Sequence, residues 1–552
     1  MRTHYPRTRH LPWSPGATVD DVRVTDLAGL RGREVVVTEK LDGENTTLYR
    51  DGLHARSLDS AHHPSRTWVK ALQGRIGHHI PEGWRVCGEN MFARHSIAYD
   101  DLDSYFYGFS VWDELGWCLD WDRTVRLLRD LGIPVPRVLW RGEFDERALR
   151  RLQLDLGRQE GFVVRSVDGF MAEEFGQRAA KWVRAGHVQT DTHWMHAAVV
   201  ENGLGPGAAL WDVRSGAAPD VKALGRAVGI ADGDAEAVAG LDLGGRTGDD
   251  RLAGVLAAML HRHRRAALAA RLASPLGMPL ARRVADLVGL HPALHRPYPD
   301  ESRRAGLVRL SHAADLGVLH AVARATASTE EAREQVAWSS LHAEDIGGLD
   351  DAGLRDAFAG LTPDAADRCR AEAREAYAQG RIGTVEEAVA ATWRWRSGDF
   401  PRLILMVGPS GSGKSTFARG LAGVDAYICL DDLREARGSR ADQKANGDIL
   451  RAGLDRLDAA LAAGGTVVWD ATSLNRQQRS LVHTVARRRD ALVTHAVVLV
   501  DEDELTGRNE RREHPVPPQV LTTQLHRFGP PYPGEAHRTW YIGTSGTVEE
   551  EV

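Results

Sequence analysis

A glycine-rich segment near the end of the chain leaves few choices of fold for the residues around it. Residues 408–416 read Gly-Pro-Ser-Gly-Ser-Gly-Lys-Ser-Thr, directly after the apolar run 402–407 and before a helix-type stretch, 417–421. In a Gly-x4-Gly-Lys-Ser pattern between a strand and a helix, backbone N–H groups wrap a phosphate, and the helix N-terminus favours its negative charge. Residues 396–552 are therefore predicted to form an α/β domain with a parallel sheet.

Each polar group in this loop has an expected task. Lys414 would reach the β and γ phosphates of a nucleotide and take part in catalysis, and Ser415 would bind a divalent metal ion. The glycines let the backbone approach the β-phosphate closely. The predicted ATP-binding residues of this segment are Gly408, Gly411, Gly413, Lys414, Ser415 and Thr416.

Length and composition place the chain among multidomain globular proteins. At 552 residues it is too long for one hydrophobic core, which predicts about two to four domains. The net charge is −6, so nucleic acid would have to bind in a local basic groove. No apolar run approaches the roughly 20 residues of a membrane span, and the N-terminus lacks the apolar core of a signal peptide. The sequence therefore gives no reason to expect a membrane partner. The four cysteines are scattered, which favours a reduced, cytoplasmic location.

A second motif follows an opening stretch that is rich in Pro and Arg and is expected to be irregular. Residues 38–45 read Thr-Glu-Lys-Leu-Asp-Gly-Glu-Asn after the apolar run 35–37. A lysine at the end of a strand, followed by Asp-Gly, has the form of a lysine that attacks a nucleotide phosphate. Because the nucleophile is the unprotonated amine, Lys40 would need nearby cations or desolvation to lower its pKa. Asp-Gly after a strand is also an ordinary turn, so this stretch alone leaves both interpretations open.

Four further stretches follow Lys40 in order, each on or beside an expected strand. They are Gly88-Glu89, an aromatic strand over 103–113, Glu160-Gly161-Phe162-Val163-Val164-Arg165, and a basic strand over 180–184. This series resembles the covalent nucleotidyltransferases, the superfamily of ATP-dependent DNA ligases, RNA ligases and capping enzymes, over about residues 34–190. The resemblance implies an α+β nucleotidyltransferase domain over residues 1–195.

Two details favour RNA ligases over DNA ligases within this superfamily. Position 45 is Asn, as in phage RNA ligases of the double-strand-sealing type, whereas DNA ligases usually carry Arg there. The sequence after Arg184 also continues without the strand-rich OB domain that is expected of DNA ligases and capping enzymes. The basic strand departs from the pattern, because relatives often show Lys-x-Lys, but here the second basic residue is Arg184, three positions after Lys181.

The resemblance implies a role for each matching residue. Lys40 would attack the α-phosphate of ATP and become lysyl-AMP, from which AMP passes to an RNA 5′-phosphate before a 3′-OH seals the strand. Phe109 would stack on adenine or, alternatively, pack in the core. Glu160 would ligate Mg²⁺ or Mn²⁺ or contact the nucleotide, and Arg56 would lie on the second strand of a hairpin. The residues implied to bind ATP or AMP are Glu39, Asn45, Arg56, Glu89, Phe109, Glu160 and Lys181, with Arg165 and Arg184 as further phosphate-binding candidates.

The segment after the glycine-rich loop resembles the phage-type 5′-hydroxyl polynucleotide kinases. The matching parts are Asp431-Asp432-x-Arg434, Asp470-x-x-x-Leu-Asn, Arg-Asn-x-x-Arg512 and Val-Pro. The similarity implies Asp431 as general base, Arg434 as the residue that binds the substrate phosphate, and Arg512 as a lid arginine on the ATP phosphates. Asp470 would contact metal or substrate, and Asp432 competes with Asp431 for the role of base.

The stretch between the two ends, residues 196–395, shows mainly helical spacing. Part of residues 201–250 is rich in Gly, Ala and Asp, as in a loop or linker. The run His-Arg-His-Arg-Arg at 261–265 could contact RNA phosphates, although a solvated helix face is the simpler interpretation. Since neither a His-Asp phosphohydrolase pattern nor a convincing pair of His-x-Ser/Thr motifs is found, this part is interpreted as a helical accessory or connector region.

Together these interpretations predict a bifunctional RNA end-repair enzyme that uses ATP with Mg²⁺ or Mn²⁺. The kinase would phosphorylate an RNA 5′-OH, and the ligase would seal that 5′-phosphate to a 3′-OH. A separate phosphatase or phosphodiesterase would have to heal the 3′ end. Three alternatives stay open: a DNA nick kinase and ligase, a small-molecule kinase fused to a nucleotidyltransferase, and a non-catalytic RNA-end sensor.

Overall fold

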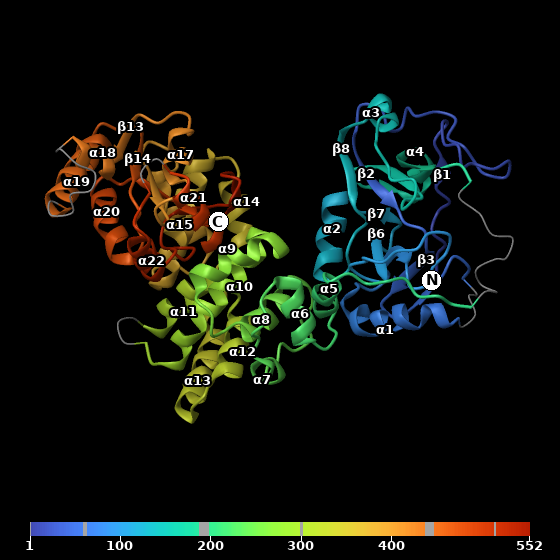
Figure 1. Ribbon diagram of the computed structural model, residues 1–552, viewed down its shortest axis with the longest axis horizontal. Coiled ribbons are helices and arrows are strands. Elements are labelled where there is room, and N and C mark those ends of the chain that lie inside the picture. Colours follow the sequence, from blue (N-terminus) through green and yellow to red (C-terminus); the bar gives the residue numbers. More distant parts are fainter. Residues whose placement is uncertain (1, 59–62, 187–197, 299–301, 437–445, 513–514) are drawn as a thin grey trace. The chain divides into compact units, whose positions relative to one another are not determined.

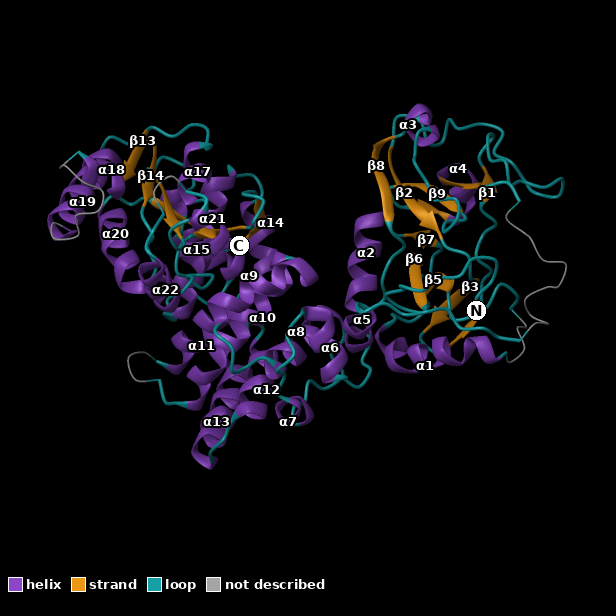
Figure 2. Cartoon of the chain, in the orientation of Figure 1, coloured by secondary structure: helices purple, strands orange, loops and turns teal. Residues whose placement is uncertain are grey.

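The computed structural model describes residues 2–58, 63–186, 198–298, 302–436, 446–512 and 515–552. By its internal contacts the chain separates into two compact units, residues 1–233 with 244–255 and residues 234–243 with 256–552. Figure 1 follows the chain by colour, and Figure 2 shows strands toward both ends of the sequence with helices between them. Among the described residues, none of the helices combines the length and the apolar character needed to cross a bilayer.

Two sheets form the first unit. The five-stranded sheet has the order β1-β11-β9-β2-β8, in which β1 runs parallel to β11 and the other pairs are antiparallel. The six-stranded sheet has the order β10-β7-β6-β5-β3-β4 and is antiparallel. The strands are β1 (Arg9–His10), β2 (Glu34–Lys40), β3 (Glu44–Tyr49), β4 (Gly52–His54), β5 (Arg85–Asn90), β6 (Phe106–Trp112), β7 (Trp117–Cys118), β8 (Val138–Glu143), β9 (Gly161–Ser166), β10 (Phe170–Met171) and β11 (Ala179–Val183).

The chain passes from one sheet to the other through a short loop between β2 and β3. β2 ends at Lys40 in the five-stranded sheet, and β3 begins at Glu44 in the six-stranded sheet. At Gly43, a Cβ atom would stand 2.6 Å from the carbonyl oxygen of Asn90, so the loop needs glycine to pass the end of β5. The valines of β2 are buried, and β-branched residues suit the strand that carries Lys40 to this crossing.

Helices α1 (Thr67–Ile76) and α2 (Trp121–Asp130) pack against the six-stranded sheet. Val69, Leu72 and Ile76 recur on one face of α1 and join a buried apolar cluster with side chains of the sheet and of α2. The cluster holds the sheet on which several predicted site residues lie. The other helices of this unit are α3 (Glu146–Arg150), α4 (Phe175–Arg178), α5 (Ala208–Arg214) and α6 (Val221–Val228), and α8 (Gly248–Met259) begins in it.

The second unit contains a six-stranded sheet of order β13-β14-β12-β15-β16-β17. Its strands run parallel except β17, which is antiparallel to β16. β12 lies between β14 and β15, and its carboxyl end leads directly into the glycine-rich loop. This arrangement confirms the predicted α/β domain with a parallel sheet. The strands are β12 (Arg402–Val407), β13 (Ala426–Cys429), β14 (Thr466–Asp470), β15 (Leu492–Val498), β16 (Arg538–Ile542) and β17 (Val548–Glu551).

Most helices of the middle stretch belong to the second unit. A buried apolar cluster joins Phe358 and Tyr377 of these helices to Leu492 of β15. Residues 198–233 and 244–255 belong to the first unit, and the other described residues of the region 196–395, which was expected to be a helical accessory or connector region, belong to the second. The helices of the second unit are α7 (Ala235–Ala239), α9 (Arg265–Leu276), α10 (Met278–Leu290), α11 (Arg303–Ser311), α12 (Leu316–Thr326), α13 (Glu330–Ile346), α14 (Asp351–Phe358), α15 (Pro363–Ala378), α16 (Val385–Ala391), α17 (Lys414–Arg419), α18 (Leu430–Glu435), α19 (Asn446–Ala462), α20 (Arg476–Arg488), α21 (Glu502–Glu510) and α22 (Pro518–Arg527).

Buried ion pairs connect α9 and α10 to the C-terminal strands. Asp286 of α10 is fully buried and binds Arg265 at 2.6 Å and Arg282 at 2.8 Å. Arg282 also binds Glu550 of β17 at 2.8 Å. Each buried charge therefore has a partner, and the network ties the helices to the sheet.

The basic run at 261–265 is engaged by carboxylates of the same unit. Arg262 pairs with Asp234 at 2.7 Å, and Arg264 pairs with Glu502. The run therefore serves contacts within the protein. The expected solvated helix face is not found, because residues 261–264 lie between α8 and α9 and Arg265 pairs with the buried Asp286.

Replacing Asp286 with alanine is expected to destabilise the second unit by about 3–5 kcal/mol, because two buried guanidinium groups lose their shared carboxylate. Thermal unfolding followed by calorimetry measures the effect. As a control, Glu330→Ala removes the partner of Arg333 in an exposed pair on α13 and should change stability by less than about 0.5 kcal/mol. Equal stability of Asp286→Ala and the unaltered protein would contradict this account of the network.

Candidate active sites

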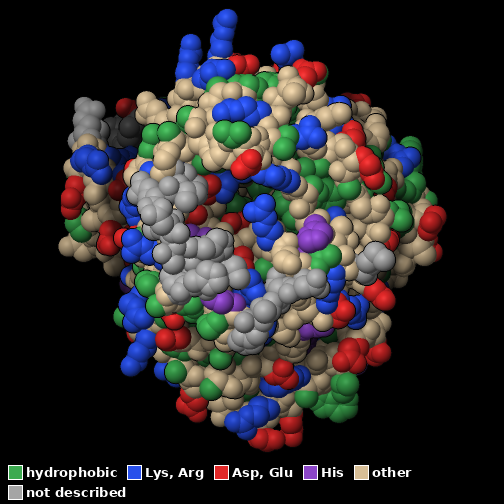
Figure 3. All heavy atoms as spheres, turned by 90° about the vertical axis from the view of Figure 1, so that its right-hand side faces the viewer, with side chains coloured by type: hydrophobic (Ala, Val, Ile, Leu, Met, Phe, Trp, Pro, Cys, Tyr) green, Lys and Arg blue, Asp and Glu red, His purple; other side chains and the backbone are tan. Residues whose placement is uncertain are grey.

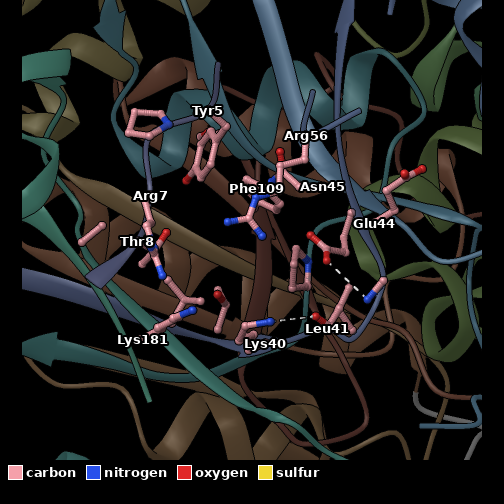
Figure 4. A pocket seen from close by; sticks show the side chains of 18 of the residues that line it. Tyr5, Arg7, Thr8, Lys40, Leu41, Glu44, Asn45, Arg56, Phe109 and Lys181 are labelled. Carbon is pink, nitrogen blue, oxygen red and sulfur yellow. Dashed lines mark hydrogen bonds between the residues drawn. The ribbon is translucent and has the colours of Figure 1, made fainter. Parts of the chain in front are cut away.

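A cavity of about 1090 Å³ in the first unit is lined by residues of both sheets. Figure 3 shows a hollow in the surface of the first unit with Lys and Arg side chains at its rim. Figure 4 shows the side chains around the cavity. Every residue that the sequence resemblance firmly assigned to ATP or AMP in this unit lines the cavity, together with Lys40. These residues are Glu39, Asn45, Arg56, Glu89, Phe109, Glu160 and Lys181.

Lys40 lies at the end of β2 with its amine against a carboxylate. Its Nζ donates to Oε2 of Glu160 at 2.5 Å and to the carbonyl oxygen of Leu41 at 3.4 Å. Burial lowers the pKa of Lys40, but the carboxylates of Glu160 and Glu89 outweigh burial and raise that pKa above its ordinary value. The expected lowering of the pKa of Lys40 is therefore not found, because carboxylates rather than cations surround the amine.

Glu89 and Glu39 add two more carboxyl groups to the cavity. Oε1 of Glu89 accepts a hydrogen bond from the backbone N–H of Gly43 at 3.3 Å. Burial raises the pKa of Glu89 to about 7, with a further rise from Glu160 and an opposing effect of Lys40. Burial also raises the pKa of Glu39. The cavity can therefore hold an extra proton near neutral pH.

Phe109 lies on β6 with its ring in the wall of the cavity. The ring is half-buried, and the ring of Tyr5 meets it edge-on at a centroid distance of 5.2 Å. Its neighbours Phe106 and Tyr107 are buried in two separate apolar clusters. Phe109 itself both lines the cavity and packs against a third buried cluster, which includes Trp112, so the structure leaves room for both interpretations of this residue.

The two predicted cations Lys181 and Arg56 line the cavity with Lys40, and Arg7, Arg66 and Arg165 line it as well. Lys181 lies on β11, where burial and then the charge of Lys40 lower its pKa. Arg56 lies two residues beyond β4, which ends at His54, so it is not on the hairpin strand as predicted. The loop position leaves the Arg56 side chain exposed at the cavity.

Two other arginines, which the sequence suggested as phosphate-binding candidates, donate hydrogen bonds to backbone carbonyl oxygens. Arg165 donates to the carbonyl oxygens of Phe109 at 3.1 Å and Leu119 at 2.9 Å, which ties β9 to the neighbouring sheet. Arg184 donates to the carbonyl oxygen of Leu156 at 2.7 Å and is not among the described residues that line the cavity. Both guanidinium groups therefore have structural tasks, and Arg165 is in addition one of the residues that line the cavity.

Sequence reasoning missed the N-terminal segment. Residues 4–8 line the cavity, and β1 follows them and pairs in parallel with β11. The segment carries no strand or helix periodicity, so only its contacts with the two sheets reveal its position.

The glycine-rich loop of the second unit has the conformation that its sequence predicts. Gly408, Gly411 and Gly413 have φ angles of +149°, +86° and +101°, which residues with a Cβ rarely adopt. Nζ of Lys414 donates to the carbonyl oxygen of Pro409 at 2.7 Å. Burial lowers the pKa of Lys414 to about 8, against the carboxylates of Asp470 and Asp431, which raise it. Ser415 and Thr416 follow in the first turn of α17 and are exposed.

The predicted acceptor-side residues come from separate elements close to Lys414. Asp431 and Arg434 lie one turn apart on α18 and form an ion pair, in which the Asp431 side chain is 68% exposed. Asp470 ends β14 and accepts a hydrogen bond from the hydroxyl group of Tyr427. Arg512 is exposed just beyond α21, and its charge contributes to the lowered pKa of Lys414.

Oxygen ligands for a divalent cation are present at both sites, but they do not form a closed set. Within the described parts of the chain, no group of three or more His, Cys, Asp or Glu side chains is arranged to hold a metal ion. Mg²⁺ commonly binds through one or two protein oxygens together with nucleotide phosphates. The carboxylate of Glu160 and the exposed hydroxyl of Ser415 fit such a shared site.

Family comparisons assign a domain to each end of the chain. Residues 33–183 match the model of the family described as RNA ligase, and residues 403–531 match that of the family described as AAA domain. The chain thus combines an N-terminal RNA ligase domain with a C-terminal P-loop domain. The predicted fold classes of both ends are confirmed.

Several solved structures are similar to parts of the chain. A chain of the Pnkp1/Rnl/Hen1 RNA repair complex is 22% identical over 23% of this chain and 44% of its own length, with a TM-score of 0.21. A Naegleria gruberi RNA ligase variant with ATP and Mn is 18% identical over 29% of this chain and 52% of its own length, with a TM-score of 0.22. A sugar kinase from Janibacter sp. HTCC2649 is 23% identical over 26% of this chain and 86% of its own length, with a TM-score of 0.22. The chain spans about half the length of the first two, and the comparison with curated proteins finds no match.

The raised pKa of Glu89 predicts that the free energy of unfolding of the first unit depends on pH. The folded state holds this proton more tightly than the unfolded chain, so Glu89 stabilises the fold below about pH 4.5 and loses this contribution as the pH rises through about 7. The free energy of unfolding of Glu89→Gln minus that of the unaltered protein should therefore be about 3 kcal/mol more favourable to the variant at pH 8 than at pH 4.5. Calorimetric unfolding of both proteins across this range measures the change. A stability difference that is constant with pH would argue against the buried carboxyl.

Proposed function

We propose that this chain, with its RNA ligase domain and its P-loop domain, is a two-site RNA end-repair enzyme. The P-loop domain phosphorylates an RNA 5′-OH with ATP, and the ligase domain seals the 5′-phosphate to a 3′-OH. The cavity of the RNA ligase domain carries the proposal, because it brings Lys40 together with three carboxyl groups and Lys181. The P-loop adds support, since Lys414 is buried close to Asp470 and Asp431.

The ligase reaction runs through three displacements at phosphorus. Nζ of Lys40 attacks the α-phosphate of ATP, a P–N bond forms, and pyrophosphate leaves. An oxygen of the RNA 5′-phosphate then attacks the same phosphorus, which releases the Lys40 amine and leaves AMP on the RNA end. Finally the 3′-OH attacks the RNA 5′-phosphorus, and AMP leaves with the bonding electrons. Positioning and charge neutralisation dominate such steps.

Lys40 must lose a proton before the first step, because neighbouring carboxylates raise its pKa. The carboxylate of Glu160 lies 2.5 Å from Nζ and is placed to accept this proton. Mg²⁺ or Mn²⁺ on the ATP phosphates would supply positive charge that favours the neutral amine. The ion pair with Glu160 thus orients the nucleophile until ATP binds.

The remaining residues of the cavity bind the nucleotide. The ring of Phe109 stacks on adenine, and the carboxyl group of Glu89 holds the ribose. Arg56 and Lys181 supply cations for the phosphates. Glu39 and Asn45 line the cavity from the two strands on either side of the crossing between the sheets, which supports a role for both beside the α-phosphate.

The kinase reaction is a single displacement. The carboxylate of Asp431 takes the proton of the RNA 5′-OH, whose oxygen attacks the γ-phosphate of ATP, and ADP leaves. Arg434 binds the RNA phosphate, for which it exchanges its ion pair with Asp431. Lys414 and Arg512 neutralise the charge on the transferred group, while Asp470 contacts metal or substrate. Ser415 would hold the divalent cation through its hydroxyl oxygen, and the cation would neutralise phosphate charge.

Joining the two activities in one chain raises the local concentration of the 5′-phosphate that the ligase consumes. A separate phosphatase or phosphodiesterase supplies the 3′-OH. The nearest alternative is the repair of DNA nicks, and a comparison of sealing rates on matched RNA and DNA nicks separates the two.

Lys40→Ala is expected to abolish covalent labelling by α-labelled ATP and to abolish sealing, because no other amine replaces the nucleophile. Transfer of γ-phosphate to 5′-OH RNA should continue in this variant. Lys70→Ala, which removes an exposed lysine of α1 outside the cavity, serves as the control and should be labelled normally. Undiminished labelling of Lys40→Ala would refute the ligase assignment.

Asp431→Ala is expected to slow phosphorylation of a 5′-OH oligoribonucleotide by about 10²–10⁴-fold, as for the loss of a general base. Sealing of RNA that already carries a 5′-phosphate should be unchanged. The matched control is Asp432→Ala, one residue further along α18, which should keep most of the phosphorylation rate. If the two variants exchange these results, Asp432 is the base.

A further inference from the structure

The basic strand of the RNA ligase domain is one cation short of the Lys-x-Lys pattern. β11 carries Lys181, but position 183 is a valine that is 4% exposed. Arg184 does not make up for the valine, because it donates to the carbonyl oxygen of Leu156 and is not among the described residues that line the cavity. Besides Lys181 and Arg56, a further phosphate-binding cation would therefore have to come from an element other than β11.

The N-terminal strap, defined here as residues 3–10, spans the two sheets along the cavity. At one end the N–H of Thr3 donates to the hydroxyl of Tyr49 in β3 at 3.0 Å, and at the other end β1 pairs with β11. Between these ends the Tyr5 ring packs edge-on against Phe109, at 5.2 Å, and against Phe175, at 5.4 Å. The strap is thus anchored at three points, which fixes the residues between them.

Arg7 of the strap lies in the cavity wall with Lys181, as Figure 4 shows. The charge of Arg7 contributes to the lowered pKa of Lys181, so the two cations interact. Nη2 of Arg7 binds Oδ1 of Asp21 at 3.0 Å and the carbonyl oxygen of Asp20 at 3.3 Å, and the side chain is 54% exposed. Because both contacts use one nitrogen of a group with five N–H donors, the guanidinium can also bind an anion.

We propose that Arg7 binds a phosphate group in the ligase cavity and takes the place of the lysine that is missing from β11. This inference rests on the proposed ligase function. A guanidinium binds two phosphate oxygens at once, which suits an anion that must be held in line with Lys40. The phosphate belongs either to ATP or to the RNA 5′ end, and these two are used in different steps of the reaction.

Two assays on Arg7→Ala test the proposal: adenylylation of Lys40 at subsaturating ATP, and sealing of a pre-adenylylated nicked RNA. We expect at least one rate to fall by roughly ten- to a hundredfold, as for the loss of a hydrogen bond to a charged group. A fall in adenylylation assigns the ATP phosphates, and a fall in sealing assigns the RNA phosphate. Arg7→Lys, which keeps the charge, should recover part of the rate. Unchanged rates in both assays would overturn the proposal.

Arg9→Ala is the matched control, because Arg9 is an exposed arginine of the same strap outside the cavity lining. Both rates should stay within about twofold of the unaltered protein, at the same melting temperature as Arg7→Ala. Losses as large as those of Arg7→Ala would show that the strap acts only through folding and would overturn the proposal.

Asp21→Asn separates phosphate binding from the ion pair. It removes the charged partner of Arg7 but keeps the guanidinium, so neither rate should fall. Equal losses in Asp21→Asn and Arg7→Ala would overturn the proposal. A different result would show that the proposed ligase function is wrong: in that case Lys40→Ala would still be adenylylated. An inactive Lys40→Ala beside a fully active Arg7→Ala overturns only the inference about Arg7.

Discussion

The contact between Lys40 and Glu160 is the interaction on which the N-terminal site depends. Lys40 is the last residue of β2, and Glu160 directly precedes β9, in which Gly161 is the partner of Lys40 in the ladder. Backbone pairing therefore holds the amine and the carboxylate 2.5 Å apart. The pair also sets the chemistry, because a buried charge needs a partner and the carboxylate keeps the amine protonated. Under the proposed function, the amine becomes a nucleophile once ATP and a divalent cation change the charges around it.

The cavity around this pair exists because two sheets meet at a glycine crossing. β2 brings Lys40 from one sheet, while β3, β5 and β6 bring Asn45, Glu89 and Phe109 from the other. The N-terminal strap connects both sheets and adds Arg7 to the same wall. Cations and carboxylates from distant parts of the chain thus share one buried space. Burial raises the pKa of Glu89 and lowers that of Lys181, and the neighbouring charges of Glu160 and Lys40, respectively, add to these shifts.

The second unit places its site at the carboxyl end of a parallel sheet, the common location of ligand sites in such folds. Its local pattern was readable, because positive φ angles at Gly408, Gly411 and Gly413 need glycine whatever surrounds them. The packing of the middle helices was not readable. Asp286 of α10 binds Arg265 of α9, and a pair between two different helices cannot be predicted from the spacing of residues within one helix. Charged residues that resembled a solvated face therefore turned out to include buried contacts.

By itself the sequence determined the two end domains and the residues of their motifs, because strand, loop and helix patterns around Lys40 and Lys414 act over a few neighbouring positions. It also supplied Phe109 and Arg165 as candidates without showing what else each side chain contacts. The tertiary structure decided that both residues line the cavity and that Arg165 also ties backbone segments together. It also decided that the pKa of Lys40 is raised and that the N-terminal strap belongs to the site. These outcomes depend on distances between groups far apart in the chain, and electrostatic and packing energies follow those distances rather than the order of residues.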